Sequence, residues 1–140
     1  MEYRRFGDTC LVRLDPGEEI VEQLTKLAES EHIVLAEVHG LGAVNDITVG
    51  VFSVEEKKFC PNRFQGTLEI VSLTGTVTEM NGKPYLHLHL SAGDPEGHVF
   101  GGHLNRAVIS ATSELTVRVL EGHVGRKFSP EIGLNLFDFS

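Results

Sequence analysis

The chain is 140 residues long, 41% of its residues are hydrophobic, and its 20 acidic and 12 basic residues give a formal net charge of −8 at pH 7. This length predicts one domain, residues 1–140, and the composition excludes both a disordered chain and an apolar run near the ~18 residues of a membrane span. Basic residues occur only in scattered pairs rather than in a stripe, so direct binding of nucleic acid is not expected.

The N-terminal part of the chain predicts a strand followed by a helix. Residues 3–14 read as a strand with a turn or bulge at Gly7 and Asp8. Asp15 and Pro16 form a helix-start signal, with Asp15 expected as the N-cap. A helix ending near residues 30–32 is expected because one stripe of this segment is apolar: Ile20, Val21, Leu24, Leu27 and Ala28.

The rest of the chain predicts a largely antiparallel sheet. The dipeptide Asn81-Gly82, placed between two alternating runs, is the strongest hairpin signal in the sequence. Strands are expected at residues 33–38, 43–54, 67–80, 85–91, 107–109, 115–120 and 134–139, with a connection or short edge hairpin at 55–65 and a short helical turn within 105–113. The predicted fold class is therefore α+β, mainly antiparallel β-sheet with one clear amphipathic helix and short helical turns.

Three histidines are candidate metal ligands. In the run Leu-His-Leu-His-Leu at residues 86–90, alternate side chains share a face, so His87 and His89 point one way and the leucines the other. A glycine pair precedes His103 and allows close backbone approach. Three neutral imidazoles with one open position are typical of catalytic rather than structural zinc. We predict that these three histidines bind a divalent metal, with a polar sheet face as the ordinary alternative.

Other chemistry-bearing residues have ordinary explanations. His98 lies in a predicted turn and His32 at a helix end, where exposure is expected. His39 lies in a glycine-rich bend and is a candidate for lining the same pocket as the three histidines. Glu114 is a candidate ligand or general base, although a charge at a strand end is commoner.

The expected location is the cytoplasm. The first 13 residues lack a hydrophobic secretory core. Cys10 and Cys60 lack Cys-x-x-Cys spacing, which indicates small buried or half-buried thiols in a reducing compartment. No Ser-His-Asp, Gly-x-Ser-x-Gly or His-Glu-x-x-His pattern identifies a hydrolytic family, and the sequence leaves open whether the protein is an enzyme.

Several segments, taken together, resemble the domain conserved between plants and prokaryotes, the PPC domain. They are residues 13–18, 40–44, 69–75, the His87/His89 pair, residues 101–104 and residues 133–136, so the similarity covers essentially the whole chain. The resemblance implies a compact α+β domain that assembles as a homotrimer. Prokaryotic members carry His-x-His and Gly-Gly-His patterns, matched here by His87, His89 and His103. In plants the domain follows AT-hook motifs, which this chain lacks, and plant relatives generally lack the histidines.

The main functional hypothesis is a cytoplasmic, trimeric domain with a three-histidine divalent metal site, most simply zinc, that supports hydrolysis or ligand capture. A small molecule or a protein is the expected partner, and a membrane is not. One alternative is a DNA-associated regulatory module that acts directly or through a partner. The other is a structural or partner-binding trimer whose histidines line an interface without metal.

Overall fold

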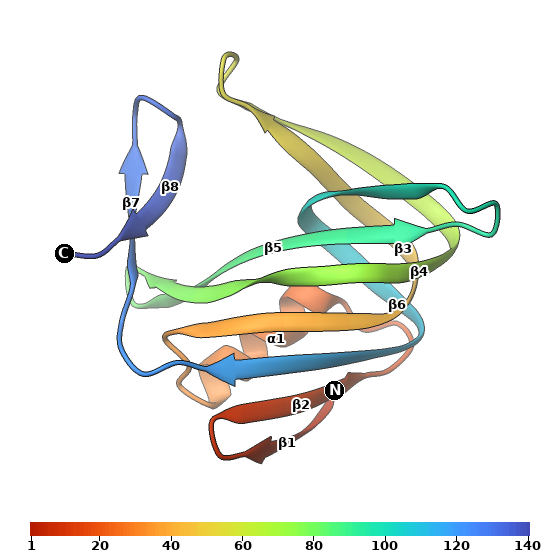
Figure 1. Cartoon of the computed structure of the whole chain (residues 1–140), viewed down its shortest axis with the longest axis horizontal. Coiled ribbons are helices and arrows are strands. Elements are labelled where there is room, and N and C mark those ends of the chain that lie inside the picture. Colours follow the sequence, from red (N-terminus) through yellow and green to blue (C-terminus); the bar gives the residue numbers. More distant parts are fainter.

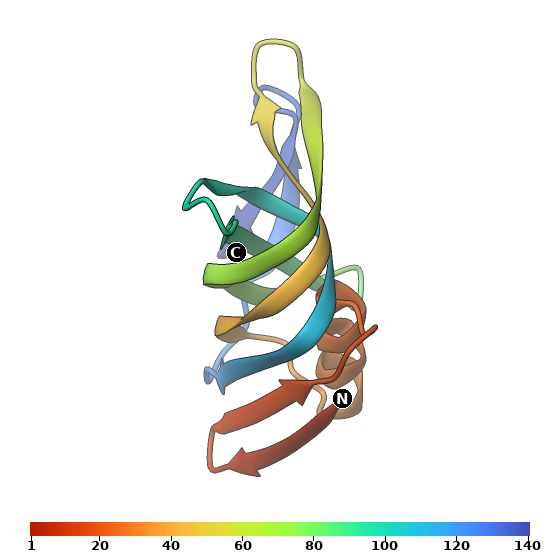
Figure 2. The same cartoon turned by 90° about the vertical axis from the view of Figure 1, so that its right-hand side faces the viewer.

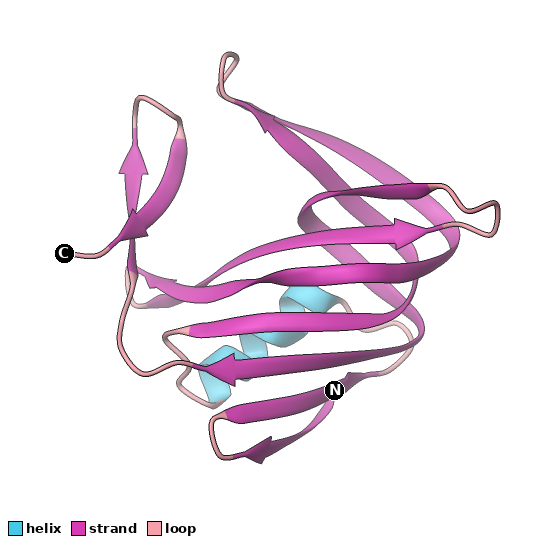
Figure 3. Ribbon diagram, viewed as in Figure 1, coloured by secondary structure: helices cyan, strands magenta, loops and turns pink.

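Strands dominate the computed structural model, which describes residues 1–140 (Figures 1 and 3). The elements are β1 (Glu2–Phe6), β2 (Thr9–Leu14), α1 (Ile20–Ser30), β3 (Ala36–Ser53), β4 (Lys58–Met80), β5 (Lys83–Gly93), β6 (Val99–Val119), β7 (Gly125–Ser129) and β8 (Leu134–Asp138). Six strands form one antiparallel sheet in the order β1-β2-β6-β3-β4-β5, and β7 and β8 form a separate two-stranded sheet. The predicted combination of a mainly antiparallel sheet and one helix is confirmed.

Strand β6 pairs with three other strands and closes the large sheet on itself. Its first residues pair with β5, from Val99 opposite Gly93 to His103 opposite His89, while its later residues pair with β3 and β2. Because β3, β4 and β5 are consecutive neighbours in the sheet, the contact between β5 and β6 completes a ring of four strands. Figure 2 shows the resulting curled sheet from the side.

Helix α1 covers one face of this sheet (Figure 2). It begins later than the sequence predicts, and the expectation that Asp15 is the N-cap is wrong. Gly17, at φ +86°, places residues 15–18 in a turn, and the carboxylate of Glu19 accepts hydrogen bonds from the first backbone N–H groups of the helix. The predicted apolar stripe is buried at Ile20, Leu24, Leu27 and Ala28 and partly buried at Val21. The helix has neither the length nor the apolar character needed to cross a lipid bilayer.

The hairpin signals are confirmed, whereas several strand boundaries are wrong. Gly7 and Asp8 form the turn between β1 and β2, and Asn81 and Gly82 join β4 to β5 with the positive φ angles of +55° and +73° that this turn requires. Residues 33–54 contain one long strand, β3, with register shifts near Gly40 and Val44 in place of a break. Most of residues 55–65 belong to β4, and no helical turn interrupts β6 within residues 105–113. In each case pairing with a neighbouring strand overrides the local turn-forming residues.

One continuous apolar core lies between α1 and the sheet. Its 25 buried residues fall between Cys10 and Val117. On β5, Leu88 and Leu90 belong to this core. The alternating histidines of the same strand therefore project from the opposite face of the sheet, away from the helix.

Candidate metal centre

Strands β5 and β6 carry three histidines to one point. His103 lies directly opposite His89 in the pairing of the two strands, and His87 shares the face of His89. The ring centroid of His87 is 5.3 Å from those of His89 and His103, and the latter two are 5.7 Å apart. One nitrogen from each ring lies within 4.8 Å of the other two. The structure thus brings together all three histidines that the sequence singles out.

A close approach of two backbones positions His103. Gly102 has φ +157°, and a Cβ atom at this position would lie 2.4 Å from the carbonyl oxygen of Gly50. A side chain would therefore push β6 away from β3, where Gly50 is the partner of His103. The glycine preceding His103 permits the close packing that the sequence predicts.

The donor set fits a divalent transition metal. Three nitrogens bound to one zinc ion at about 2.0–2.1 Å lie about 3.3 Å apart in a tetrahedron. The ligand atoms of the three histidines lie within 4.8 Å of one another, which is farther apart than in a zinc site. Small rotations of the side chains can bring them to the shorter distance. Neutral imidazole nitrogens suit zinc, copper, iron and nickel rather than calcium or magnesium.

The surroundings favour the neutral, metal-ligating form of His87 and His103. Desolvation by the surrounding protein lowers the pKa of His87, and the positive charge that His103, His89 and Arg126 would place nearby lowers it further. Desolvation is also the main cause that lowers the pKa of His103, followed by His89. His87 and His89 remain open to solvent and His103 is half-buried, so all three rings are accessible to a dissolved ion.

The histidines line a cavity of about 810 Å³ that opens beside the β7–β8 hairpin. Figure 1 shows this hairpin standing on the same side of the molecule as the end of the long β3–β4 hairpin, with β5 running below both. Apolar side chains from these elements form much of the wall: Val51, Phe52, Phe59, Leu134, Leu136 and Phe137. The rings of Phe59 and His103 pack nearly perpendicular to each other, with 5.7 Å between their centroids. The volume is in the range of small-molecule binding sites.

Arg126 also lines the cavity, and sequence reasoning missed it. The sequence indicates only a surface pair, Arg126-Lys127, and does not predict strand β7. In the structure Lys127 is exposed, whereas Arg126 is half-buried, with its guanidinium carbon 4.6 Å from the ring centre of Tyr85 and 4.3 Å from that of Phe137. Nothing in the local sequence separates the two basic residues, because their difference arises from the packing of β7 against Thr78 of β4 and Tyr85 of β5.

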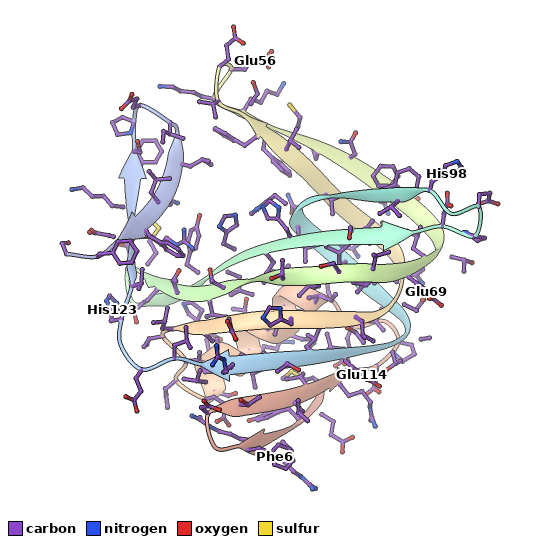
Figure 4. All side chains as sticks on the ribbon, viewed as in Figure 1. Phe6, Glu56, Glu69, His98, Glu114 and His123 are labelled. Carbon is purple, nitrogen blue, oxygen red and sulfur yellow. The ribbon has the colours of Figure 1, made fainter.

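The other candidate residues lie outside this cavity. His98 is at the turn between β5 and β6, far from β7 and β8 in Figure 4, where its Nδ1 is 2.9 Å from the carboxylate of Asp94. His39 is exposed on β3, and its nearest acidic group is 3.9 Å away. The expectations that His39 lines the pocket and that Glu114 serves the site are wrong, because Glu114 is exposed beside β2 and lines a separate shallow depression.

Comparisons with known proteins agree with this geometry. A structure from Bacteroides thetaiotaomicron, of a protein named as a candidate DNA-binding protein, is 30% identical, covers 99% of this chain and 96% of its own, and superposes with a TM-score of 0.95. A metal-containing protein from Archaeoglobus fulgidus is 32% identical over 97% of this chain and 96% of its own, with a TM-score of 0.86. The bifunctional protein GlmU of Synechococcus is 27% identical over 125 residues; these cover 87% of this chain, which spans only 19% of that protein.

A family model matches most of the chain. It describes the Plants and Prokaryotes Conserved domain and matches residues 1–121, which include the six-stranded sheet, the helix and all three histidines. The match ends before β7 and Arg126. Because this match covers residues 1–121 of the 140, the chain belongs to the Plants and Prokaryotes Conserved domain family.

Proposed function

We propose that this protein is a divalent-metal-binding domain in which His87, His89 and His103 hold the ion, with zinc as the metal, and leave one position open to a ligand in the cavity. The observation that carries the proposal is the convergence of three imidazole nitrogens within 4.8 Å from two paired strands. The metal-containing Archaeoglobus relative supports it, as it shares the fold over nearly its full length.

In such a site the histidines and the apolar wall residues would have different roles. The three imidazoles would fix the ion on the face of the sheet opposite α1, and the apolar walls from β3, β4 and β8 would restrict the water around a bound ligand. With a metal in place, the available chemistry is Lewis-acid attraction of an oxygen-bearing ligand. The residues therefore suit capture of a small molecule inside a partly enclosed, weakly polar cavity.

Metal analysis of protein purified without a histidine tag tests this proposal. We expect about one zinc ion per chain in the parent protein and loss of most of it in His103→Ala, since two imidazoles and solvent bind zinc far more weakly than three. The matched control is His39→Ala, which removes an exposed histidine from β3 outside the cavity and should leave the zinc content unchanged. A parent protein without stoichiometric metal contradicts the proposal.

We also propose that the domain assembles as a homotrimer, as the family resemblance implies. Large apolar side chains exposed on β7, β8 and the C-terminal residues support burial in an assembly: Phe128, Leu134, Leu136, Phe137 and Phe139. Light scattering coupled to size-exclusion chromatography should give three times the mass of one 140-residue chain. A single-chain mass at micromolar concentration contradicts trimer formation.

Association with DNA is a second candidate function, favoured by the name of the Bacteroides relative. The net charge of −8 opposes direct binding, because phosphate contacts depend on lysine and arginine. We expect no mobility shift of duplex DNA at moderate salt. A complex whose affinity falls steeply as salt rises would favour this function instead.

A further inference from the structure

The guanidinium of Arg126 is held in the cavity by neutral groups alone. Its Nε donates to the hydroxyl of Thr78 at 2.9 Å, and its Nη1 donates to the backbone oxygen of Asn135 at 3.2 Å. The rings of Tyr85 and Phe137 also lie against it. These contacts use two of the five N–H groups of an arginine.

The remaining donors of Arg126 lack an acceptor. Nη2 is enclosed by protein and makes no hydrogen bond. Such a group is costly, because a buried donor without a partner loses its hydration without compensation. Arginine residues with a structural role normally pair with carboxylates, as Arg63 and Arg106 do with Asp46 in this chain. Although the chain contains 20 acidic residues, none forms an ion pair with Arg126.

The charge of the cavity points in the same direction. All fifteen lining residues are neutral or basic, and Arg126 is the permanently charged one among them. A divalent ion on neutral imidazoles would add to this positive charge. The chain carries a net charge of −8, yet no carboxylate lines this cavity. The positive charge of Arg126 therefore favours binding of a dissolved anion.

The walls restrict what that molecule can be. Phe59 and the leucines of β8 present apolar surface, whereas Tyr85, Asn105 and Asn135 add a few neutral polar groups. A phosphate dianion needs several cationic or backbone donors around it, whereas a single arginine can balance the one negative charge of a carboxylate. The lining therefore fits a molecule with an apolar body and a single carboxylate.

We propose that the cavity binds a small organic carboxylate, with the guanidinium of Arg126 pairing with the carboxylate group and the apolar walls contacting the body of the molecule. This inference rests on the proposed function, since it names the class of ligand for the same cavity. Arg126 lies beyond the residues that the family model matches, so the match to the family does not itself assign this role.

Benzoate is a suitable probe because it combines one carboxylate with an apolar ring, and benzamide is its neutral counterpart of nearly equal shape. Binding would be measured by isothermal titration calorimetry on the full chain, with zinc and after removal of metal. We expect Arg126→Met to weaken benzoate binding at least about tenfold, which corresponds to losing a hydrogen bond to a charged group. The binding of benzamide should change less than twofold.

Lys127→Met is the matched control. It removes a positive charge one residue away on β7, at an exposed position, so a purely long-range effect of charge would appear in both variants. We expect benzoate to bind Lys127→Met as it binds the parent protein. Arg126→Lys serves as a second variant if Arg126→Met does not fold; it keeps the charge but loses the planar fork, and should weaken benzoate binding while leaving benzamide unaffected.

Three results would overturn the inference. They are equal benzoate affinity in the parent protein and both Arg126 variants, no benzoate binding in the millimolar range by the zinc-loaded parent, and displacement of benzoate by inorganic phosphate at lower concentration than by acetate. Failure of the proposed metal site gives a different signature: the protein contains no zinc, while the dependence of benzoate binding on Arg126 persists in the metal-free chain.

Discussion

Asp46 shows how two arginines set the charge state of one carboxylate. Arg63 donates to both of its oxygens at 2.8 Å, and Arg106 adds a third hydrogen bond of 2.8 Å. The two hydrogen bonds from Arg63, followed by the one from Arg106, lower the pKa of Asp46 from 3.8 to about 2. A carboxylate whose pKa is lowered by folding stabilises the folded state above its unfolded pKa, and this contribution is lost as the pH falls through the folded value.

We therefore expect Asp46→Asn to lower the free energy of unfolding by about 1 kcal/mol at pH 7, a figure reduced from the pKa shift because both arginines are about half exposed. The difference should shrink between pH 3.8 and about 2. Urea unfolding of both proteins at pH 7 and pH 3 measures it. Glu121→Gln, an exposed acid without an ion pair, is the control and should show no such change; a constant difference at both pH values contradicts the assignment.

At single positions, the sequence predicts the histidine site better than the arginine beside it. His87 and His89 can be placed on one face because the two-residue period of a strand is a local property of the chain. The convergence of His103 depends on the pairing of β5 with β6, which the intervening turn and the glycine pair only suggest. Arg126 depends on a hairpin that packs across the sheet, and no local pattern encodes that packing.

Among the elements, α1 depends on one carboxylate at its first turn. Glu19 accepts hydrogen bonds from the N–H groups of Val21 at 3.1 Å and Glu22 at 2.8 Å, and also from that of Ala107 on β6 at 2.8 Å. One side chain thus caps the helix and attaches it to the sheet. A longer side chain serves here instead of the usual short caps because it must also reach β6.

Glu19→Ala should lower the free energy of unfolding by about 2 kcal/mol, since it removes a helix cap and leaves the Ala107 N–H without its acceptor. The midpoint of urea unfolding measures the loss. Glu22→Ala, which removes an exposed pair with Lys26 on the same helix, should cost less than about 0.5 kcal/mol. Equal losses in the two variants would contradict the role of Glu19.

The boundaries of the elements also show the limits of the sequence. Ile20, Leu24 and Leu27 identify the helix because their spacing is helical, but Asp15 and Pro16 carry a start signal that the chain uses for a turn. In β3, Gly40 and Gly42 would usually favour a break, but each is paired with β4 on one side and with β6 on the other. The strand therefore continues through them.

At the scale of the whole molecule, the β7–β8 hairpin is separate from the structural core. All 25 core residues lie between Cys10 and Val117, and the hairpin adds none. Its side chains instead form one wall of the cavity, including Arg126 and Leu134. The hairpin thus contributes to the wall of the cavity and not to the apolar core.

Removal of residues 122–140 should leave the six-stranded sheet folded, because the apolar core remains intact. The truncated protein should keep about one zinc ion per chain, because all three histidines remain. It should bind benzoate at least about tenfold more weakly, because Arg126 is missing. Circular dichroism, metal analysis and calorimetry measure the three properties. A truncated chain that binds benzoate as well as the parent would contradict the division between core and wall.

The pairing of His89 with His103 has a consequence for length variation in the gene. A single-residue insertion within either paired segment would turn every side chain beyond it to the other face of the sheet, exchanging imidazoles for leucines in the interior. An insertion into the Asp94–His98 loop leaves the pairing untouched. Homologous sequences should therefore differ in length at that loop, while the paired segments on either side of it keep a constant length.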